Sequence, residues 1–360
     1  MTASDDSAGL TITDVERFGK LLDDGLLLVG FDQTISYANS AASKMLGEEL
    51  VNRQLSDVFP QVTFEDVLKN IGTAKRPHEF IYSHQKSITR QFRVKLTALS
   101  DTLVSVLLMD MTLQRNLDKV RRDFVANVSH ELRSPLTSLI GFVETMRSDD
   151  EMPSDMRSHF LGIMDEEAKR MTRLIDDLIS LSRVEVEEHI VPDEEVGVRE
   201  VMMSVIEILK DRATRQEMTI QFHDGFAEDA PVPRIKGDRD EIVEVMHNLI
   251  ENAIKYGHPR SIIDIEMMPV EKGQVCCVVT NQGDGIEERH IPRLTERFYR
   301  VDKARSRQKG GTGLGLAIVK HIVNRHRGEL SITSELGAST SFTVQFPLLK
   351  TSAASKRVEI

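Results

Sequence analysis

The chain has 360 residues, of which 40% are hydrophobic and 29% charged, and its net charge at pH 7 is −11. This balance excludes collagen, a disulfide-stapled miniprotein and wholesale disorder, and the length predicts two or three domains. The basic residues form no aromatic-interleaved stripe, which argues against a nucleic-acid partner. The longest strongly apolar run, 26–31, is far shorter than the ~20 residues of a membrane span, so no transmembrane segment is expected.

Two further observations bear on the compartment. Residues 1–10 are acidic and mostly polar, without the basic and apolar regions of a secretory signal peptide. Cys276 and Cys277 are adjacent within an apolar run, where neighbours rarely form a disulfide and lie too close together to act as metal ligands. We interpret them as buried strand residues in a reducing compartment.

Residues 15–112, which follow an expected loose tail at 1–14, are predicted to form a small α/β domain. Apolar runs on either side of a turn at 31–33 indicate a β-hairpin, and later alternating segments indicate an antiparallel sheet. The expected strands are 26–31, 34–38, 80–82, 87–95 and 103–109, and the expected helices are 41–46 and 65–71.

The hydrophobic period changes after residue 112. Apolar residues from Leu113 to Val143 recur every three or four positions, which predicts a long amphipathic helix with a coiled-coil start. A turn at 149–154 leads to a second helix, whose apolar face runs from Phe160 to Leu181. Because a lone helical hairpin cannot cover its own apolar stripe, a dimeric four-helix bundle is expected.

Residues 189–350 alternate strands and helices, which predicts an α/β sandwich with helices on one face of a mixed sheet. Residues 351–360 are expected to be a second tail. The fold class is therefore multidomain α+β. The expected helices are 240–255 and 313–327, and the expected strands are 262–268, 274–280, 329–333 and 340–346.

His130 begins the string His-Glu-Leu-Arg-Ser-Pro-Leu on the first long helix. Two residues turn an α-helix by about 200°, so a histidine two positions from both Val128 and Leu132 points away from the buried stripe. Glu131 follows and can tune or accept its proton, whereas Pro135 favours a kink. Such a combination is costly for a purely structural helix and indicates a functional histidine.

A polar face is predicted on the helix at 240–255. Asn248, Glu251, Asn252 and Lys255 follow one another at i, i+3, i+4 and i+7 and therefore share that face. Amide and carboxylate oxygens suit Mg²⁺, and a lysine suits a phosphate. Taken alone, the same pattern also fits an ordinary solvated stripe.

Two glycine-rich segments follow this helix. Residues 281–286 end a strand and residues 310–316 open a helix, where backbone N–H groups can approach phosphates. A P-loop would end in Gly-Lys-Ser/Thr, and a Rossmann turn would follow a strand directly, so both are disfavoured. The basic stretch 289–309 between them is either a solvated surface or a loop over an anionic ligand.

Together these motifs resemble the two-component sensor histidine kinases with a GHKL-type ATP-binding domain, over about residues 113–348. The stretch 291–326 is similar to the phosphate-regulon (PhoR) type, and residues 15–112 resemble a PAS domain. The matching motifs are the H-box at 124–137, the N-box at 248–256, the G1 box at 281–286, the F-box at 297–300, the G2 box at 311–316 and a last glycine motif at 337–342.

The resemblance implies a PAS domain at 15–112, a dimerisation and histidine phosphotransfer (DHp) hairpin at 113–188 and a catalytic domain at 189–350. ATP would phosphorylate His130, with Glu131 holding or taking the proton of the other ring nitrogen. The phosphoryl group would pass to an Asp on a PhoB/OmpR-like receiver domain. The implied location is the bacterial cytosol, including the inner face of the plasma membrane.

The resemblance also implies a nucleotide site. Asn252 would ligate Mg²⁺, with Asn248 or Glu251 assisting through oxygen or water, and the basic stretch 289–309 would be the ATP lid. The other implied nucleotide contacts are Lys255, Tyr256, Asn281, Gly283, Gly285, Ile286, Phe298, Arg300, Gly311, Thr312, Gly313, Leu314, Gly315, Leu316 and Thr340.

Three departures from the family pattern stand out. Asn281 replaces an Asp that accepts a hydrogen bond from the adenine amino group; an amide oxygen still accepts, so ATP binding is expected to persist, weaker by ~1 kcal/mol. Ser134 stands where a Thr or Asn usually orients water for the reverse, phosphatase reaction, and a serine hydroxyl can serve there. The third departure is architectural: most relatives of the phosphate type are anchored by membrane helices, whereas none is expected in this chain.

Two other functions stay open from the sequence alone. The first is a catalytically weak, PAS-containing dimeric scaffold, which the replacement of Asp by Asn281 motivates. The second is another ATPase of the GHKL type, although those proteins lack a phospho-acceptor helix. The first domain is expected to dimerise and to relay a signal into the helix at 113–130. A flavin photosensor would need a nearby cysteine, and His78 and His84 are the candidates for haem ligation.

Overall fold

The computed structural model divides the chain into two compact units, residues 1–123 and 124–360. Residues 1–11 and 351–360 of the predicted tails, and residues 303–309 of the basic stretch, lie outside the described residues. The described ranges are 12–47, 49–74, 76–85, 89–148, 152–227, 232–270, 273–302 and 310–349.

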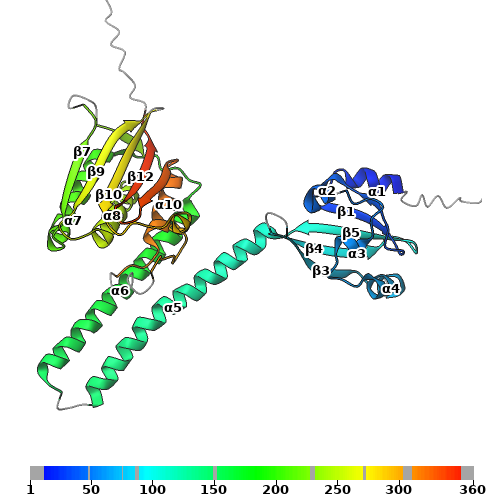
Figure 1. Ribbon diagram of the computed structural model, residues 1–360, viewed down its shortest axis with the longest axis horizontal. Helices are drawn as coiled ribbons and strands as arrows, with labels where there is room; N and C mark the ends of the chain where they lie inside the picture. The colour runs from blue at the N-terminus through cyan, green and yellow to red at the C-terminus, as the bar shows by residue number, and fades with distance from the viewer. Residues whose placement is uncertain are drawn as a thin grey trace, which may run out of the picture. The chain divides into compact units, whose positions relative to one another are not determined.

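The first unit is built on a five-stranded antiparallel sheet in the order β2-β1-β5-β4-β3 (Figure 1). The predicted hairpin is β1 paired with β2, and β1 also pairs with β5 at the centre of the sheet. The elements are α1 (Ile12–Gly19), β1 (Gly25–Gly30), β2 (Ile35–Ala38), α2 (Ser40–Leu46), α3 (Leu55–Val58), α4 (Phe64–Ala74), β3 (His78–Gln85), β4 (Thr89–Ala98) and β5 (Leu103–Asp110).

A buried asparagine holds the start of this unit together. Oδ1 of Asn39 accepts hydrogen bonds from the amides of Leu26 and Ala42, each at 2.9 Å. Its Nδ2 donates to the carbonyls of Gly19 and Asp24, also at 2.9 Å. One side chain therefore caps α2 and ties α1 and β1 to it, and its hydrogen-bonding capacity is satisfied despite burial.

Aromatic rings fill the interior between α3, α4 and the sheet. Phe59 makes edge-to-face contacts with Phe64, Phe80 and Tyr82, at centroid distances of 6.2, 5.9 and 4.8 Å. Such edge-to-face geometry is favoured for aromatic pairs. His84 lies on β3, where its Nδ1 is 3.3 Å from the Tyr82 hydroxyl.

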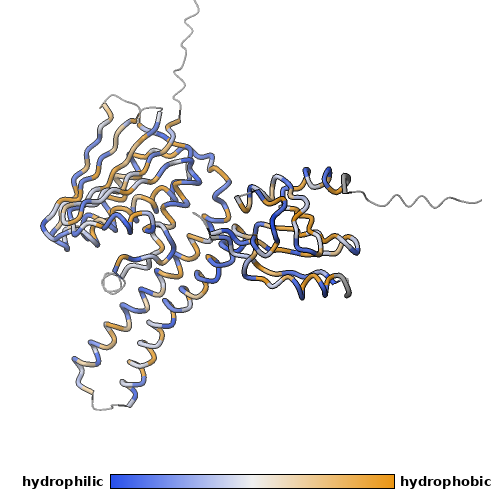
Figure 2. Tube along the Cα trace, turned by 45° about the vertical axis from the view of Figure 1, so that its right-hand side comes forward, coloured by the Kyte–Doolittle hydropathy of each residue, from blue (hydrophilic) through white to orange (hydrophobic). Residues whose placement is uncertain are grey.

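The predicted helical hairpin is present as α5 (Thr112–Ser148) and α6 (Ser154–Glu187), and α5 runs through the buried Pro135 without a break. In Figure 2, hydrophilic and hydrophobic stretches alternate along both helices. Many apolar side chains nevertheless remain 39–63% exposed on the single hairpin. Examples are Leu136, Ile140, Val143, Leu161, Ile175 and Ile179.

The C-terminal region is the predicted sandwich. Its sheet has the order β11-β12-β10-β9-β7, with β7 parallel to β9 and the other pairs antiparallel. The elements are β6 (Glu195–Gly197), α7 (Val198–Arg215), β7 (Thr219–Asp224), β8 (Arg234–Lys236), α8 (Arg239–Tyr256), β9 (Ile262–Val270), β10 (Gln274–Gln282), the 3₁₀ helix η1 (Glu288–Arg293), α10 (Gly315–Arg325), β11 (Glu329–Glu335) and β12 (Ser339–Pro347).

Helices α7, α8 and α10 lie together on one face of this sheet (Figure 1). Helix α10 begins at Gly315, two residues later than predicted, because Gly313 has φ +78° and cannot continue a right-handed helix. Cys276 and Cys277 are buried in β10, as predicted.

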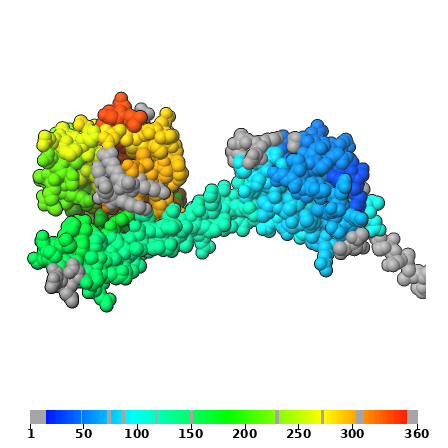
Figure 3. All heavy atoms as spheres, turned by 60° about the horizontal axis from the view of Figure 1, so that its bottom comes forward, coloured from blue at the N-terminus to red at the C-terminus, as the bar shows by residue number. Residues whose placement is uncertain are grey.

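The C-terminal turns of α6 pack against α10, and Figure 3 shows the hairpin directly against the sandwich. Polar side chains line this contact. Glu188 accepts from His321 at 2.8 Å and from Asn324 at 3.0 Å, and Arg297 lies 2.6 Å from Glu185. The hairpin from Phe124 onward and the C-terminal region therefore form one compact unit.

A buried polar cluster joins the end of α10 to the start of α8. His326 donates from Nδ1 to the Ile322 carbonyl at 2.8 Å and accepts at Nε2 from the Asp238 amide at 3.0 Å. Arg325, also buried, is paired with Glu241. Both nitrogens of His326 are thus satisfied by the neutral ring, and burial lowers its pKa below the usual value.

The stability of the C-terminal region should therefore fall with acidification. In the unfolded chain this histidine is protonated near pH 6.5. In the folded chain its pKa is lower, although Asp238 and Glu241 face the ring. Below pH 6.5 the protein therefore takes up a proton when it unfolds, which favours the unfolded state. We expect a loss of up to about 1.4 kcal/mol per pH unit. Thermal unfolding between about pH 7.5 and 5.5 should show it, and His326→Gln should flatten the dependence. Equal pH dependence in wild type, His326→Gln and the exposed control His189→Gln would contradict this assignment.

Candidate functional site

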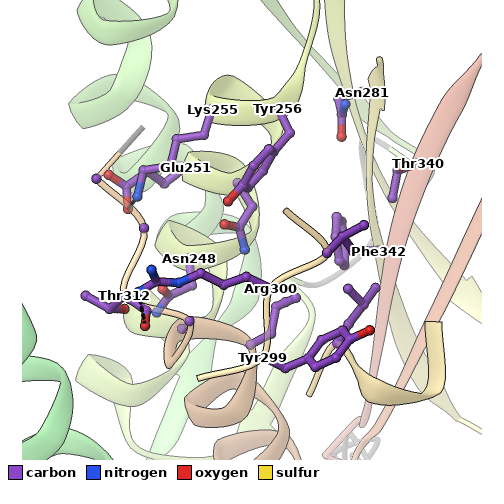
Figure 4. A pocket seen from close by; sticks show the side chains of 18 of the residues that line it. Asn248, Glu251, Lys255, Tyr256, Asn281, Tyr299, Arg300, Thr312, Thr340 and Phe342 are labelled. Carbon is purple, nitrogen blue, oxygen red and sulfur yellow. Dashed lines mark hydrogen bonds and ion pairs between the residues drawn. The ribbon is translucent and has the colours of Figure 1, made fainter. Parts of the chain in front are cut away.

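A cavity of about 490 Å³ lies between α8, the strands β10 and β12, the turn before α10 and the side of α6 (Figure 4). Its lining combines carboxylates, amides, cations and glycines with a few apolar side chains. The sequence-predicted residues that line it are Asn248, Glu251, Asn252, Lys255, Tyr256, Asn281, Gly285, Ile286, Arg300, Gly311, Thr312, Gly313, Gly315, Leu316 and Thr340.

Helix α8 supplies the polar wall. Its opposite face is buried in the core through residues such as Val245 and Leu249, so the polar stripe predicted from the spacing faces the cavity. Glu251 lies 2.6 Å from Arg212 and 3.3 Å from Lys255. Burial lowers the pKa of Lys255; burial would raise the pKa of Glu251, but its two cationic neighbours outweigh burial and lower it.

The glycine turn before α10 fits closely against its neighbours. A side chain at Gly313 would meet the Phe298 backbone at 3.0 Å, and one at Gly315 would come within 2.4 Å of Asn248 Oδ1. The amide of Phe298 donates to the Gly313 carbonyl at 2.8 Å. Glycine is therefore required for the turn to lie this close to α8, where its N–H groups can meet a ligand.

Helix α6 contributes a second set of carboxylate contacts. The hydroxyl of Thr312 donates to Asp177 at 2.6 Å, and the hydroxyl of Ser180 donates to Glu244 at 2.7 Å. Burial raises the pKa of both carboxyl groups despite these hydrogen bonds. One side of the helical hairpin is thus also a wall of the cavity.

His130 is exposed on α5, as predicted. Its neighbour Glu131 is held by two arginines, Arg170 at 3.1 Å and Arg300 at 3.3 Å. Arg300 also donates to the Thr312 carbonyl at 2.6 Å. The Arg300 side chain therefore connects the histidine-bearing turn of α5 to the rim of the cavity.

Several predicted residues lie elsewhere. Leu314 is fully buried in the core, Gly283 pairs with Gly257 beside the cavity, and Phe298 packs on Phe124 at a centroid distance of 5.9 Å. Seven further lining residues lie within the predicted motifs and lid, although they were not singled out: Asp284, Leu294, Tyr299, Val301, Asp302, Gly310 and Phe342. The lining residues that the prediction missed altogether are Arg173, Asp177, Arg212, Glu244 and His247.

Oxygen donors suited to Mg²⁺ face the cavity. Asn252 and Asn248 lie one turn apart on α8, and both line it. Among the described residues no group of three or more His, Cys, Asp and Glu side chains is arranged to hold a metal by itself. The donor set therefore fits a cation held jointly with a phosphate-bearing ligand.

No helix within the described ranges is long and apolar enough to cross a bilayer.

Two family models match the chain. The "His Kinase A (phospho-acceptor) domain" matches residues 120–187, and the "Histidine kinase-, DNA gyrase B-, and HSP90-like ATPase" matches residues 237–350. The first range covers most of the hairpin, and the second covers the cavity apart from its α6 and α7 walls.

Curated proteins and solved structures give the same picture. The chain is 32% identical to the phosphate regulon sensor protein PhoR of Pseudomonas aeruginosa, over 93% of this chain and 74% of PhoR. It is 32% identical to sensor histidine kinase WalK of Bacillus subtilis, over 91% of this chain and 54% of WalK. Its fold is similar to histidine kinase ThkA, solved in complex with response regulator protein TrrA, with TM-score 0.50 and 20% identity over 90% of this chain and 96% of ThkA. The chain therefore belongs to the sensor histidine kinases of two-component systems and is an ATP-dependent histidine kinase.

Proposed function

We propose that ATP bound in the cavity phosphorylates His130. The observation that carries this is the link from Glu131 through Arg300 to the Thr312 carbonyl, which joins the histidine-bearing turn to the cavity rim. Lys255 and the backbone amides of Gly311, Gly313 and Gly315 would hold the phosphates. Asn252, with Asn248, would hold Mg²⁺, whose chemistry is to neutralise charge on the phosphates. Glu251 instead binds Lys255 and Arg212.

The chemical step is an in-line displacement. A neutral imidazole nitrogen of His130 attacks the γ-phosphorus, the bond to the bridging oxygen of the β-phosphate breaks, and ADP leaves with that oxygen. The proton on the other ring nitrogen would pass to Glu131. Both arginines bind the same carboxylate oxygen of Glu131, Oε2, and so hold this carboxylate in place on the residue next to His130.

The phosphoryl group would then pass to an Asp on a PhoB/OmpR-like receiver domain. The solved complex of ThkA with a response regulator supports a partner of this class. Ser134, exposed one turn after His130, is proposed to position water in the reverse reaction. Incubation of the phosphorylated kinase with receiver domains from the source organism tests the transfer: rapid loss of label to one receiver supports it, and transfer to none of them contradicts it.

The N-terminal unit is proposed to be a PAS domain at 15–112, ahead of a DHp hairpin at 113–188 and a catalytic domain at 189–350. The sheet order β2-β1-β5-β4-β3, with the helices between β2 and β3, supports this assignment. Its proposed role is to dimerise and to relay a signal into α5. Since the phosphoryl donor is ATP, we place the kinase in the bacterial cytosol, where the inner face of the plasma membrane is also accessible.

We propose that the hairpin pairs with a second copy as a four-helix bundle. Ile140 and Ile179 are 51% and 63% exposed on the single chain, and a partner hairpin would bury both. Ile140→Glu and Ile179→Glu should each shift the protein from dimer to monomer in analytical ultracentrifugation, because a buried unpaired carboxylate is costly. Ile208→Glu, which changes a 66% exposed residue on α7, is the matched control and should stay dimeric. A hairpin variant as dimeric as this control would count against the bundle.

A further inference from the structure

The two ends of the cavity differ in chemistry. Lys255, Thr312 and the Arg300 guanidinium stand at one end, beside the glycine turn, and Arg173 and Arg212 also line the cavity (Figure 4). A triphosphate belongs at this cationic end, where arginines, a lysine and backbone amides converge. The base of the nucleotide must then lie at the opposite end.

Strands β10 and β12 form that opposite end. Asn281 and Thr340 are directly opposed across the two strands, and Phe342 and Ile286 complete an apolar surround. Asn281 is 3% exposed, and Figure 4 shows its side chain directed into the cavity. None of the side-chain hydrogen bonds within the described part of the chain involves its amide. Its amide therefore faces the cavity with both its donor and its acceptor available to a ligand.

The hydroxyl of Thr340, opposite Asn281, offers only lone pairs to the ligand. Ser334 Oγ donates its hydrogen to the Ser339 carbonyl at 3.0 Å and accepts from the Ile286 amide at 2.9 Å. Its 2.7 Å contact with Thr340 Oγ1 must therefore use the Thr340 hydrogen. Of this pair of opposed side chains, only the Asn281 amide can both donate and accept.

We infer that Asn281 lets the site accept purine triphosphates with either a 6-amino or a 6-oxo group. This inference rests on the proposed binding of ATP in the cavity. Adenine presents a donor at N6 beside an acceptor at N1, whereas hypoxanthine presents an acceptor at O6 beside a donor at N1. Rotation of the amide by a half turn exchanges its oxygen and nitrogen, so one side chain matches both edges. A carboxylate has no hydrogen to donate, so one that faces position 6 can bond the amino group but not O6.

Calorimetric titration with ATP and with inosine triphosphate tests the inference in the full-length protein. In the wild type the two dissociation constants should agree within about tenfold, with ATP ahead because Thr340 only accepts. Asn281→Asp should raise the ratio of the dissociation constant for inosine triphosphate to that for ATP by at least about tenfold, because the carboxylate faces the O6 lone pairs without a hydrogen to donate.

Gln282→Glu is the matched control, because it makes the same chemical change at the next residue of β10, which is exposed and does not line the cavity. It should leave the ratio unchanged. A wild type that rejects inosine triphosphate a thousandfold or more relative to ATP, or an Asn281→Asp ratio equal to that of the control, overturns the inference while ATP binding stands. Failure of the wild type to bind ATP would overturn the proposed site itself, and the inference with it.

Discussion

His130→Gln is expected to abolish autophosphorylation while leaving ATP binding intact. Glutamine keeps a polar side chain of similar length on the exposed face of α5 but has no nucleophilic nitrogen. Incubation with Mg²⁺ and γ-labelled ATP should give acid-labile, alkali-stable label in the wild type and background label in the variant. Because His130 does not line the cavity, the dissociation constant for ATP should change by less than about twofold.

His159→Gln is the matched control for this experiment. His159 is a second exposed histidine of the same hairpin, on α6 rather than on the helix α5 that carries the H-box. The control should label like the wild type. Acid-labile label that survives His130→Gln would show that another residue accepts the phosphoryl group.

Gly285→Ala is expected to destabilise the catalytic region by about 3 kcal/mol or more. Gly285 has φ +70°, and an added Cβ would lie 2.2 Å from the Glu335 carbonyl oxygen and 2.7 Å from Leu336 Cα. Neither backbone atom can move without shifting the β11–β12 turn. Because Gly285 also lines the cavity, nucleotide affinity should fall with it.

Gly337→Ala separates the two causes. Gly337 has φ +72°, yet nothing lies within 4 Å of its added Cβ, so the variant carries the backbone strain without the collision. Its expected cost is about 1 kcal/mol. The midpoint temperature of the ATP-binding region, identified as the transition whose midpoint rises when ATP is added, should fall by roughly 2–4 °C per kcal/mol. The two variants should therefore be easy to distinguish. Equal shifts would mean that strain alone sets the cost at Gly285.

Local patterns in the sequence predict much of this site. The spacing of Asn248, Asn252 and Lys255 places them on one face of a helix, and the opposite apolar face decides that this polar one meets the cavity. The exposure of His130 follows in the same way from its offset to the apolar stripe. Helical periodicity determines each of these positions without knowledge of the tertiary fold.

Contacts between distant segments are not predictable in this way. Asp177 belongs to an amphipathic helix whose pattern gives no sign that its carboxylate meets Thr312, 135 residues later. Likewise, the arginines that bind Glu131 come from α6 and from the segment before the glycine turn. Leu314 is the converse case: the glycine-rich motif includes it, but its apolar side chain packs into the core, which the motif does not indicate.

The position of the phosphoryl group after reaction with Mg²⁺ and ATP shows which residue accepts it. Proteolysis at alkaline pH, which preserves phosphohistidine, followed by mass spectrometry would locate it. We expect phosphate on His130. Phosphate on any other residue, or an unmodified chain that nevertheless binds ATP, would contradict it.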